Sequence, residues 1–185
     1  MGFSYLAGNK WEDITRDERL FCAHLFFAAR NNIQPLLQLL LEKGAINAAE
    51  SENEWEIAYE VCFYRDYIFN LGFNGTKNIG STPFSHLGKR TFDLCLFSEK
   101  KMIIIEAKAQ QGFSTEQLQY FTNDIKQLKE LINQCPEIVL VGLASSRYSP
   151  KKETREIFQS LMNWKELYDL YEEPRLLQAD NVFRK

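Results

Sequence analysis

The sequence lacks any pair of cysteines at CxxC spacing, and its four cysteines are separated by 40, 33 and 40 residues. Each of them lies in an apolar segment. Isolated cysteines of this kind are typical of core thiols in a reducing compartment rather than of a disulfide framework. We therefore expect a cytoplasmic protein in which these residues are unpaired: Cys22, Cys62, Cys95 and Cys135.

Long hydrophobic runs are also absent. The apolar stretches, such as FCAHLFFAA and IVLVGLA, are far shorter than the roughly 20 residues that a membrane span needs. The sequence begins without a basic region followed by an apolar segment, so no secretory signal is expected. These features predict a protein that does not associate with membranes.

An excess of positive charge is missing as well, because 22 Lys and Arg face 25 Asp and Glu. Any contact with nucleic acid must then use a local basic patch rather than the charge of the whole surface. Nine glycines and five prolines among 185 residues leave no room for a long disordered tract. We expect one globular α/β domain covering residues 1–185.

Patterns typical of helix N-termini divide the chain. Thr15–Glu18, Ser51–Glu54 and Ser114–Gln117 have the residue types of capping boxes, in which two side chains satisfy free backbone N–H groups. A short apolar helix is expected to end at Gly44, and Pro150 suits the first turn of a last helix. Apart from the helix that begins near Thr15, the expected helices cover about 35–43, 51–70, 114–134 and 151–170.

Three apolar runs predict strands, at 91–97, 101–108 and 137–144. Together with the helices they give the order α, α, α, β, β, α, β, α. A helix between the second and third strands implies a right-handed crossover, and hence a mixed central sheet flanked by helices. Residues 51–185 are expected to form this core, with 12–50 as an accessory helical hairpin.

The first two strands contain an unusual set of polar residues. The only polar break between them is Ser98–Lys101, so the turn should centre between residues 99 and 100. This register places Asp93 directly opposite Glu106, and strand alternation puts Lys108 on the same face. The opposite face is expected to carry Phe92, Leu94, Ile103 and Ile105.

Two opposed carboxylates in an apolar hairpin need a physical reason. Like charges facing each other destabilise a sheet, and their burial costs more. A divalent cation removes the conflict, because hard cations such as Mg²⁺ prefer carboxylate oxygens and water. A lysine beside the ion can orient an attacking water or stabilise a phosphoryl transition state. The triplet therefore favours phosphodiester hydrolysis.

Asp93, a spacer of 12 residues and Glu106-Ala107-Lys108 resemble the signature of the PD-(D/E)XK nuclease superfamily. The resemblance covers about residues 51–145 and implies a restriction-endonuclease-like αβββαβ core. The proline of the signature is replaced here by Phe92. The resemblance implies that Asp93 and Glu106 bind Mg²⁺, with Mn²⁺ as a substitute.

The same resemblance implies further roles. Lys108 would position or activate the nucleophilic water, and the carbonyl of Ala107 would complete the metal shell. Relatives often add a glutamate from the helix before the hairpin, and here Glu60 is favoured over Glu56 because it sits deeper in the expected helix 51–70.

Contacts with nucleic acid are expected close to this hairpin. Lys89 and Arg90 enter the strand that carries Asp93, and Gln110 follows the motif, as a glutamine often does in relatives. DNA is the expected substrate through the resemblance, in preference to RNA, and the N-terminal hairpin offers a face for a homodimer.

Other interpretations remain open at this point. The three polar residues could form a structural ion pair at a sheet edge, although the run from Met102 to Ile105 is typical of a buried central strand. The same fold could also have lost its chemistry and serve as a module that binds nucleic acid or a protein. An RNA endonuclease would keep the site and change the groove.

Overall fold

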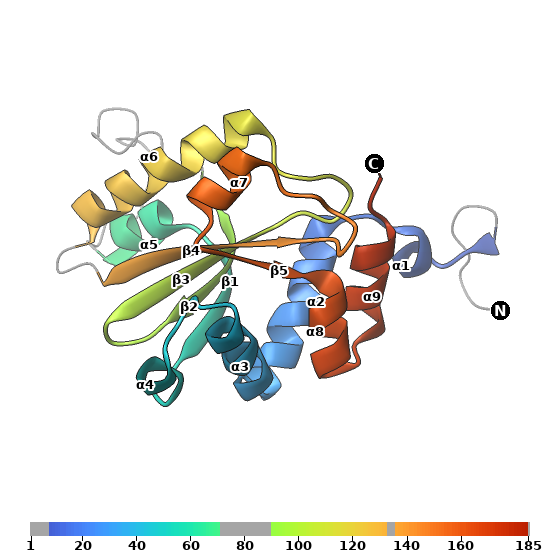
Figure 1. Cartoon of the computed structure of the whole chain (residues 1–185), viewed down its shortest axis with the longest axis horizontal. Helices are drawn as coiled ribbons and strands as arrows, with labels where there is room; N and C mark the ends of the chain where they lie inside the picture. Colours follow the sequence, from blue (N-terminus) through green and yellow to red (C-terminus); the bar gives the residue numbers. More distant parts are fainter. Residues whose placement is uncertain (1–7, 71–89, 133–135, 185) are drawn as a thin grey trace.

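The structure is a computed structural model, and it describes residues 8–70, 90–132 and 136–184. Within these ranges, five strands form one open mixed sheet in the order β1-β2-β3-β4-β5, with helices on both faces (Figure 1). β2 runs antiparallel to both of its neighbours, β1 and β3, and β4 and β5 continue the sheet in parallel with β3. The strands are β1 (Glu56–Val61), β2 (Phe92–Phe97), β3 (Lys101–Ala107), β4 (Glu137–Ala144) and β5 (Ser160–Asn163).

Among the described ranges, four helices precede the first strand, and the other helices lie between or after strands. None of them is both long enough and apolar enough to cross a membrane. They are α1 (Trp11–Ile14), α2 (Glu18–Asn31), α3 (Gln34–Glu42), α4 (Ala48–Ser51), α5 (Phe63–Asn70), α6 (Thr115–Leu131), α7 (Lys152–Ile157), α8 (Trp164–Tyr171) and α9 (Pro174–Asn181).

One face of the sheet is covered by α2, α3, α8 and α9 (Figure 1). The apolar side of α2 lies against Leu94, Ile103 and Ile105 of the central strands. Trp164, the first residue of α8, is fully buried in the same cluster and packs edge-on against Phe21 of α2. The first and last thirds of the chain therefore share one core with the sheet.

The other face is covered by α5, α6 and α7 (Figure 1). Phe121 of α6 lies beside Phe158, with ring centroids 5.5 Å apart. Both belong to a second apolar cluster that also contains Cys95 and Ile104 of the central strands. The central strands are thus buried on both sides, which explains the apolar run from Met102 to Ile105 in β3.

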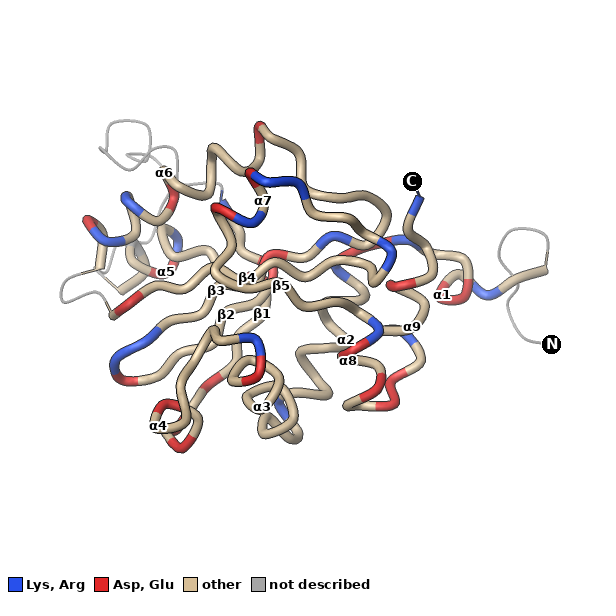
Figure 2. The backbone as a smooth tube through the Cα atoms, viewed as in Figure 1, with Lys and Arg blue, Asp and Glu red and all other residues tan. Residues whose placement is uncertain are grey.

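Charged residues of both signs are interspersed along the backbone (Figure 2). This distribution agrees with the near balance of Lys and Arg against Asp and Glu in the sequence. Inside the protein, Cys22, Cys62 and Cys95 are buried free thiols, as the sequence predicted. Cys135 lies outside the described residues.

The β2–β3 hairpin has the register that the sequence predicted. Leu94 pairs with Ile105, and Leu96 pairs with Ile103. Because the turn is fixed by Ser98, whose N–H donates to the carbonyl of Lys101, the alternation of both strands is fixed too. One expectation is wrong: Phe92 belongs to the second cluster and not to the face of Leu94.

The helix expected over 51–70 is wrong. The chain forms α4, then the edge strand β1, then α5. Asn47 and Glu50 make the capping box that starts α4, and this helix ends after one turn at Ser51. Ile57 and Val61 pair with Leu96 and Phe92 of β2, so pairing with the hairpin overrides a helical reading of the sequence.

The helix expected over 151–170 is also interrupted. Its middle forms the short strand β5, which pairs in parallel with β4. Asn163 then caps α8 with a capping box to Glu166. The helix expected to begin near Thr15 is α2, and it is capped by Asp17 rather than by Thr15. The capping box of Ser114 and Gln117 is confirmed.

Candidate active site

Three acidic residues lie in one row across β1, β2 and β3. Tyr59 pairs with Leu94 and Val61 pairs with Phe92, which places Glu60 level with Asp93. The hairpin register in turn places Asp93 level with Glu106. The row continues to Gly142 on β4, which is the registered partner of Glu106.

Glu60 enters this row from a strand and not from a helix, so the expected helical position is wrong. Its φ of 53° is in the left-handed region, which costs a non-glycine residue free energy and often marks a functional position. Its carboxylate lies 3.5 Å from Nε of Arg19. Glu56 occupies the other end of β1, opposite Phe97.

Asp93 is held by the backbone of the neighbouring strand. The N–H of Ala107 donates to Oδ2 of Asp93 at 2.8 Å. Burial raises the pKa of this carboxyl, while the hydrogen bond from Ala107 and the charge of Lys108 partly offset the rise. The side chain therefore has a fixed orientation and an environment that disfavours its charge.

Glu106 is the more deeply buried carboxylate, with only 6% of the residue exposed. Oε1 accepts a hydrogen bond from Nη2 of Arg90 at 3.3 Å. Oε2 is buried and has no hydrogen-bond partner among the described residues. Burial, followed by the charge of Asp93, raises the pKa of Glu106 to about 8.

Lys108 lies just beyond β3 and is 7% exposed. Its Nζ donates to the carbonyl of Ala107 at 2.7 Å and to Oε1 of Glu18 at 3.0 Å. Burial alone would lower the pKa of Lys108, but Glu18 and Glu106 outweigh it and the pKa is raised. The side chain is therefore an ammonium at neutral pH.

The backbone of Lys108 is fixed from two sides. Its N–H donates to the carbonyl of Leu143 on β4 at 2.7 Å. Its carbonyl accepts a hydrogen bond from Nε1 of Trp164 at 3.0 Å. Gln110, the expected nucleic-acid contact, donates through Nε2 to the carbonyl of Arg16 at 3.1 Å.

Glu18 is a member of this site that the sequence analysis missed. It is the first residue of α2, and its Oε2 accepts a hydrogen bond from the N–H of Ala109 at 2.8 Å. The sequence assigned Glu18 to a capping box with Thr15, and that assignment concealed its role. The glutamate that a helix brings to this site is therefore Glu18, and the helix is α2.

Arg90 lies inside the site. Its side chain is 25% exposed, and Nε lies 3.2 Å from Oδ2 of Asp124 while Nη2 binds Glu106. The guanidinium also lies over two aromatic rings, 5.3 Å from the centroid of Phe92 and 4.9 Å from that of Phe121. Lys89, its expected companion in binding nucleic acid, lies outside the described residues.

Asp124 on α6 is the second residue that the sequence analysis missed. It is buried among the apolar residues of α6, and burial raises its pKa while Arg90 partly offsets the rise. A buried acid on an otherwise apolar helix face needs a partner. This rule could have marked Asp124 in the sequence, although it could not have identified Arg90 as the partner.

The donor chemistry of the site fits a hard divalent cation. Asp93 and Glu106 offer carboxylate oxygens, and one buried oxygen of Glu106 lacks a partner among the described residues, a situation that an ion would resolve. Across 8–70, 90–132 and 136–184, no three His, Cys, Asp or Glu side chains already converge as a ligand cluster. Asp93 and Glu106 are thus the residues that would hold Mg²⁺, together with water.

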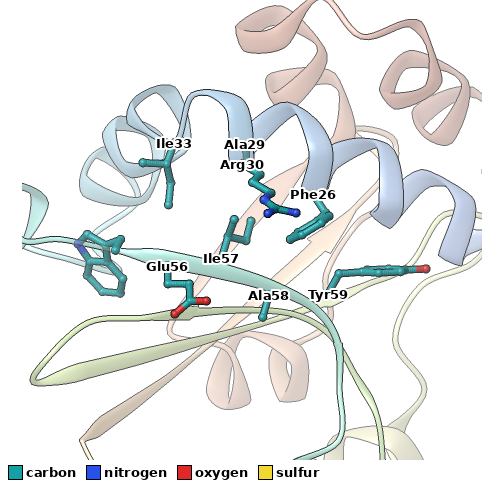
Figure 3. Close-up of a pocket in the computed structure, with 9 residues that line it drawn as sticks. Phe26, Ala29, Arg30, Ile33, Glu56, Ile57, Ala58 and Tyr59 are labelled. Atoms are coloured by element: carbon teal, nitrogen blue, oxygen red, sulfur yellow. The ribbon is translucent and has the colours of Figure 1, made fainter.

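A separate groove lies between α2 and the edge strand β1 (Figure 3). Its volume is about 570 Å³, and its lining is mixed, with Phe26 and Ile33 beside the charged Arg30 and Glu56. None of the residues Asp93, Glu106 and Lys108 lines it. The groove therefore does not contain the candidate chemistry.

Comparisons of the chain with protein-family models, with curated proteins and with solved structures found no match. Function has to be argued from the geometry of the site.

Proposed function

We propose that this protein is a Mg²⁺-dependent nuclease of the PD-(D/E)XK type. One observation carries the proposal: Asp93 and Glu106 oppose each other on adjacent buried strands, next to the ammonium of Lys108. A purely structural carboxylate pair of this kind would be unfavourable, because burial and mutual repulsion both act against the charges.

The order of the surrounding elements supports the proposal. From α2 onward, leaving aside the short helices, the site is built by α2, β1, β2, β3, α6 and β4, with β1 to β3 antiparallel and β4 parallel to β3. With α3, α4 and α5 left out, this order is consistent with the αβββαβ core that the resemblance implies. The strand β1, which the sequence analysis expected to be helical, is needed for that consistency.

In the proposed reaction, Asp93 and Glu106 have one role and Lys108 has another. Asp93 and Glu106 would hold the cation, which supplies a water of lowered pKa and positive charge beside the scissile phosphate. Hydrolysis joins the water oxygen to phosphorus and breaks the bond to the leaving alkoxide, which takes up a proton. Because Lys108 is an ammonium, its part is to donate hydrogen bonds and stabilise negative charge.

In the proposed reaction, Glu18 positions the side chain of Lys108. It accepts one hydrogen bond from the ammonium and a second from the N–H of Ala109. Both contacts come from the segment that follows β3. Glu18 therefore holds the ammonium beside the two carboxylates and keeps it protonated.

The proposed substrate is nucleic acid, with DNA preferred over RNA. Lys89 and Gln110 are proposed to contact phosphate, whereas Arg90 is already paired with Glu106 and Asp124. A homodimer through the N-terminal helices is part of the proposal. Net charge is −3, so substrate affinity depends on such a local set of donors.

The test compares Lys108→Ala with Lys101→Ala. Both lysines are 7% exposed and both pair with a glutamate, but Lys101 lies at the other end of β3, where it binds Glu50. Supercoiled plasmid, single-stranded DNA and RNA are incubated with each folded variant, with Mg²⁺, with Mn²⁺ and with EDTA. We expect metal-dependent cleavage that Lys108→Ala abolishes and Lys101→Ala retains.

A second candidate function is a catalytically inactive module of the same fold that binds nucleic acid or a protein. One observation favours it: Lys108 and Arg90 are already paired with Glu18, Glu106 and Asp124 inside the chain. Absence of cleavage on every substrate, together with no stabilisation by Mg²⁺ or Mn²⁺, would support this module and refute the nuclease.

A further inference from the structure

Arg90 lies beside Glu106, where it compensates the charge of the carboxylate. Once an ion is bound to Glu106, that compensation is no longer needed. Nη2 lies 3.3 Å from Oε1 of Glu106, and Nε lies 3.2 Å from Oδ2 of Asp124. Arg90 Nε, Asp124 Oδ2 and Glu106 Oε2 are all buried without a well-directed hydrogen bond in the described part of the chain. The contact with Asp124 is therefore mainly electrostatic, whereas the contact with Glu106 includes one hydrogen bond.

The guanidinium is also fixed in place by apolar groups. Phe92 on β2 and Phe121 on α6 present their rings to it at 5.3 and 4.9 Å, in the range of cation–π attraction. A charge that is held by two rings and by Asp124 can remain near the site whether or not Glu106 is bound to it.

We infer, on the basis of the proposed function, that Arg90 is a built-in competitor of the metal. It pairs with Glu106 in the metal-free protein, and Asp124 on α6 sets how strongly it does so. Arg90 and Asp124 are positioning residues here, because both act through Glu106.

Electrostatics gives the two substitutions opposite effects on metal affinity. Removing the guanidinium takes a positive charge away from a ligand carboxylate, so a divalent cation should bind more tightly. Removing the charge of Asp124 leaves Arg90 with Glu106 as its only carboxylate partner among the described residues, so the cation should bind more weakly. A purely structural role would make both substitutions harmful in the same direction.

The experiment measures Mn²⁺ binding to the metal-free protein by electron paramagnetic resonance, which detects the free ion. Arg90→Met keeps an apolar stem between the two phenylalanines, and Asp124→Asn keeps the shape of the acid. We expect about tenfold tighter binding for Arg90→Met, equivalent to about 1.4 kcal/mol, and severalfold weaker binding for Asp124→Asn. If Arg90→Met fails to fold, the double variant Arg90→Met/Asp124→Asn takes its place in the binding measurement.

Arg175→Met is the matched control, because Arg175 pairs with Glu12 and Asp13 on α1, outside the site. It should leave Mn²⁺ binding unchanged. Unchanged or weaker binding in both folded variants that lack Arg90 would overturn the inference while leaving the nuclease proposal intact, provided that the wild type binds Mn²⁺.

The metal site and the competitor can fail separately. Binding by Arg90→Met but not by the wild type would support the competitor. If neither the wild type nor any variant binds Mn²⁺, both the inference and the proposed metal site are refuted.

Discussion

Replacing Glu106 by Gln should stabilise the metal-free protein. The substitution removes a charge but keeps the shape of a residue that is 6% exposed and has one oxygen without a partner in the described ranges. Most substitutions of buried residues destabilise a protein. A gain in stability would therefore be a specific sign of a carboxylate kept for function rather than for folding.

The size of the effect depends on pH. The pKa of Glu106 rises from its ordinary value of 4.5 to about 8 in the folded protein. A raised carboxyl pKa leaves stability unaffected below pH 4.5, and stability is lost progressively as pH rises toward the folded pKa. At 1.36 kcal/mol for each pH unit, the upper bound is about 5 kcal/mol, and we expect roughly 2 kcal/mol after relaxation of the surroundings.

The assay is thermal unfolding of wild type and Glu106→Gln in EDTA, at about pH 5 and about pH 8. The two proteins should melt closer together at the lower pH. At the higher pH the variant should melt about 4–8 °C above the wild type. Saturating Mg²⁺ should then raise the melting temperature of the wild type and not that of the variant.

One result would refute this reasoning. If Glu106→Gln melts below the wild type at both pH values, then the pair with Arg90 stabilises the fold. Glu106 would then be a structural residue, and the argument for a metal at this position would lose its main support.

Three further substitutions test other parts of the site. Glu18→Gln should slow cleavage and lower the free energy of unfolding by about 1.5–3 kcal/mol, because it weakens the contact with the ammonium of Lys108. Unchanged cleavage rates would contradict its positioning role. Trp164→Phe removes the hydrogen bond to the carbonyl of Lys108 and also leaves a cavity at a fully buried position, so it should cost more than about 1 kcal/mol in a urea titration; an unchanged midpoint would contradict this. Gly142→Ala brings a Cβ within 2.6 Å of Leu161 and should cost about 1–3 kcal/mol by overpacking; an unaltered denaturation curve would mean that Leu161 moves aside freely.

The central strands were predictable because their signals are local. A polar break between two apolar runs fixed the β2–β3 turn, and the turn fixed the register that brings Asp93 opposite Glu106. β4 was predicted with its observed limits, 137–144. In each case the sequence within a few residues contained the whole pattern.

The edge strands were not predictable in this way. β1 has the burial pattern of a half-exposed strand, but the glutamates at 52, 54, 56 and 60 also suit a helix surface. β5 has only four residues and is bounded by α7 and α8. Both strands exist because a neighbouring strand offers hydrogen bonds, and that neighbour lies more than 15 residues away in sequence.

The supporting residues of the site were missed for a related reason. Glu18 and Lys108 are separated by 90 residues, and Arg90 and Asp124 lie on different elements. Spacing along a strand can place two ligands on one face, but it cannot reveal which distant helix delivers their partner. The motif was visible in the sequence, whereas the contacts that orient it required the fold.

The hydrogen bond between Trp164 and Lys108 also has a consequence for protein synthesis. The two residues are 56 positions apart, so at 5–20 residues per second the indole follows the lysine from the ribosome by roughly 3–11 seconds. Until then the apolar cluster between the sheet and α2 lacks Trp164, its largest side chain. The segment after β3 also lacks the donor that holds it. A nascent chain therefore contains Asp93, Glu106 and Lys108 before α8 is available to hold the segment that follows β3.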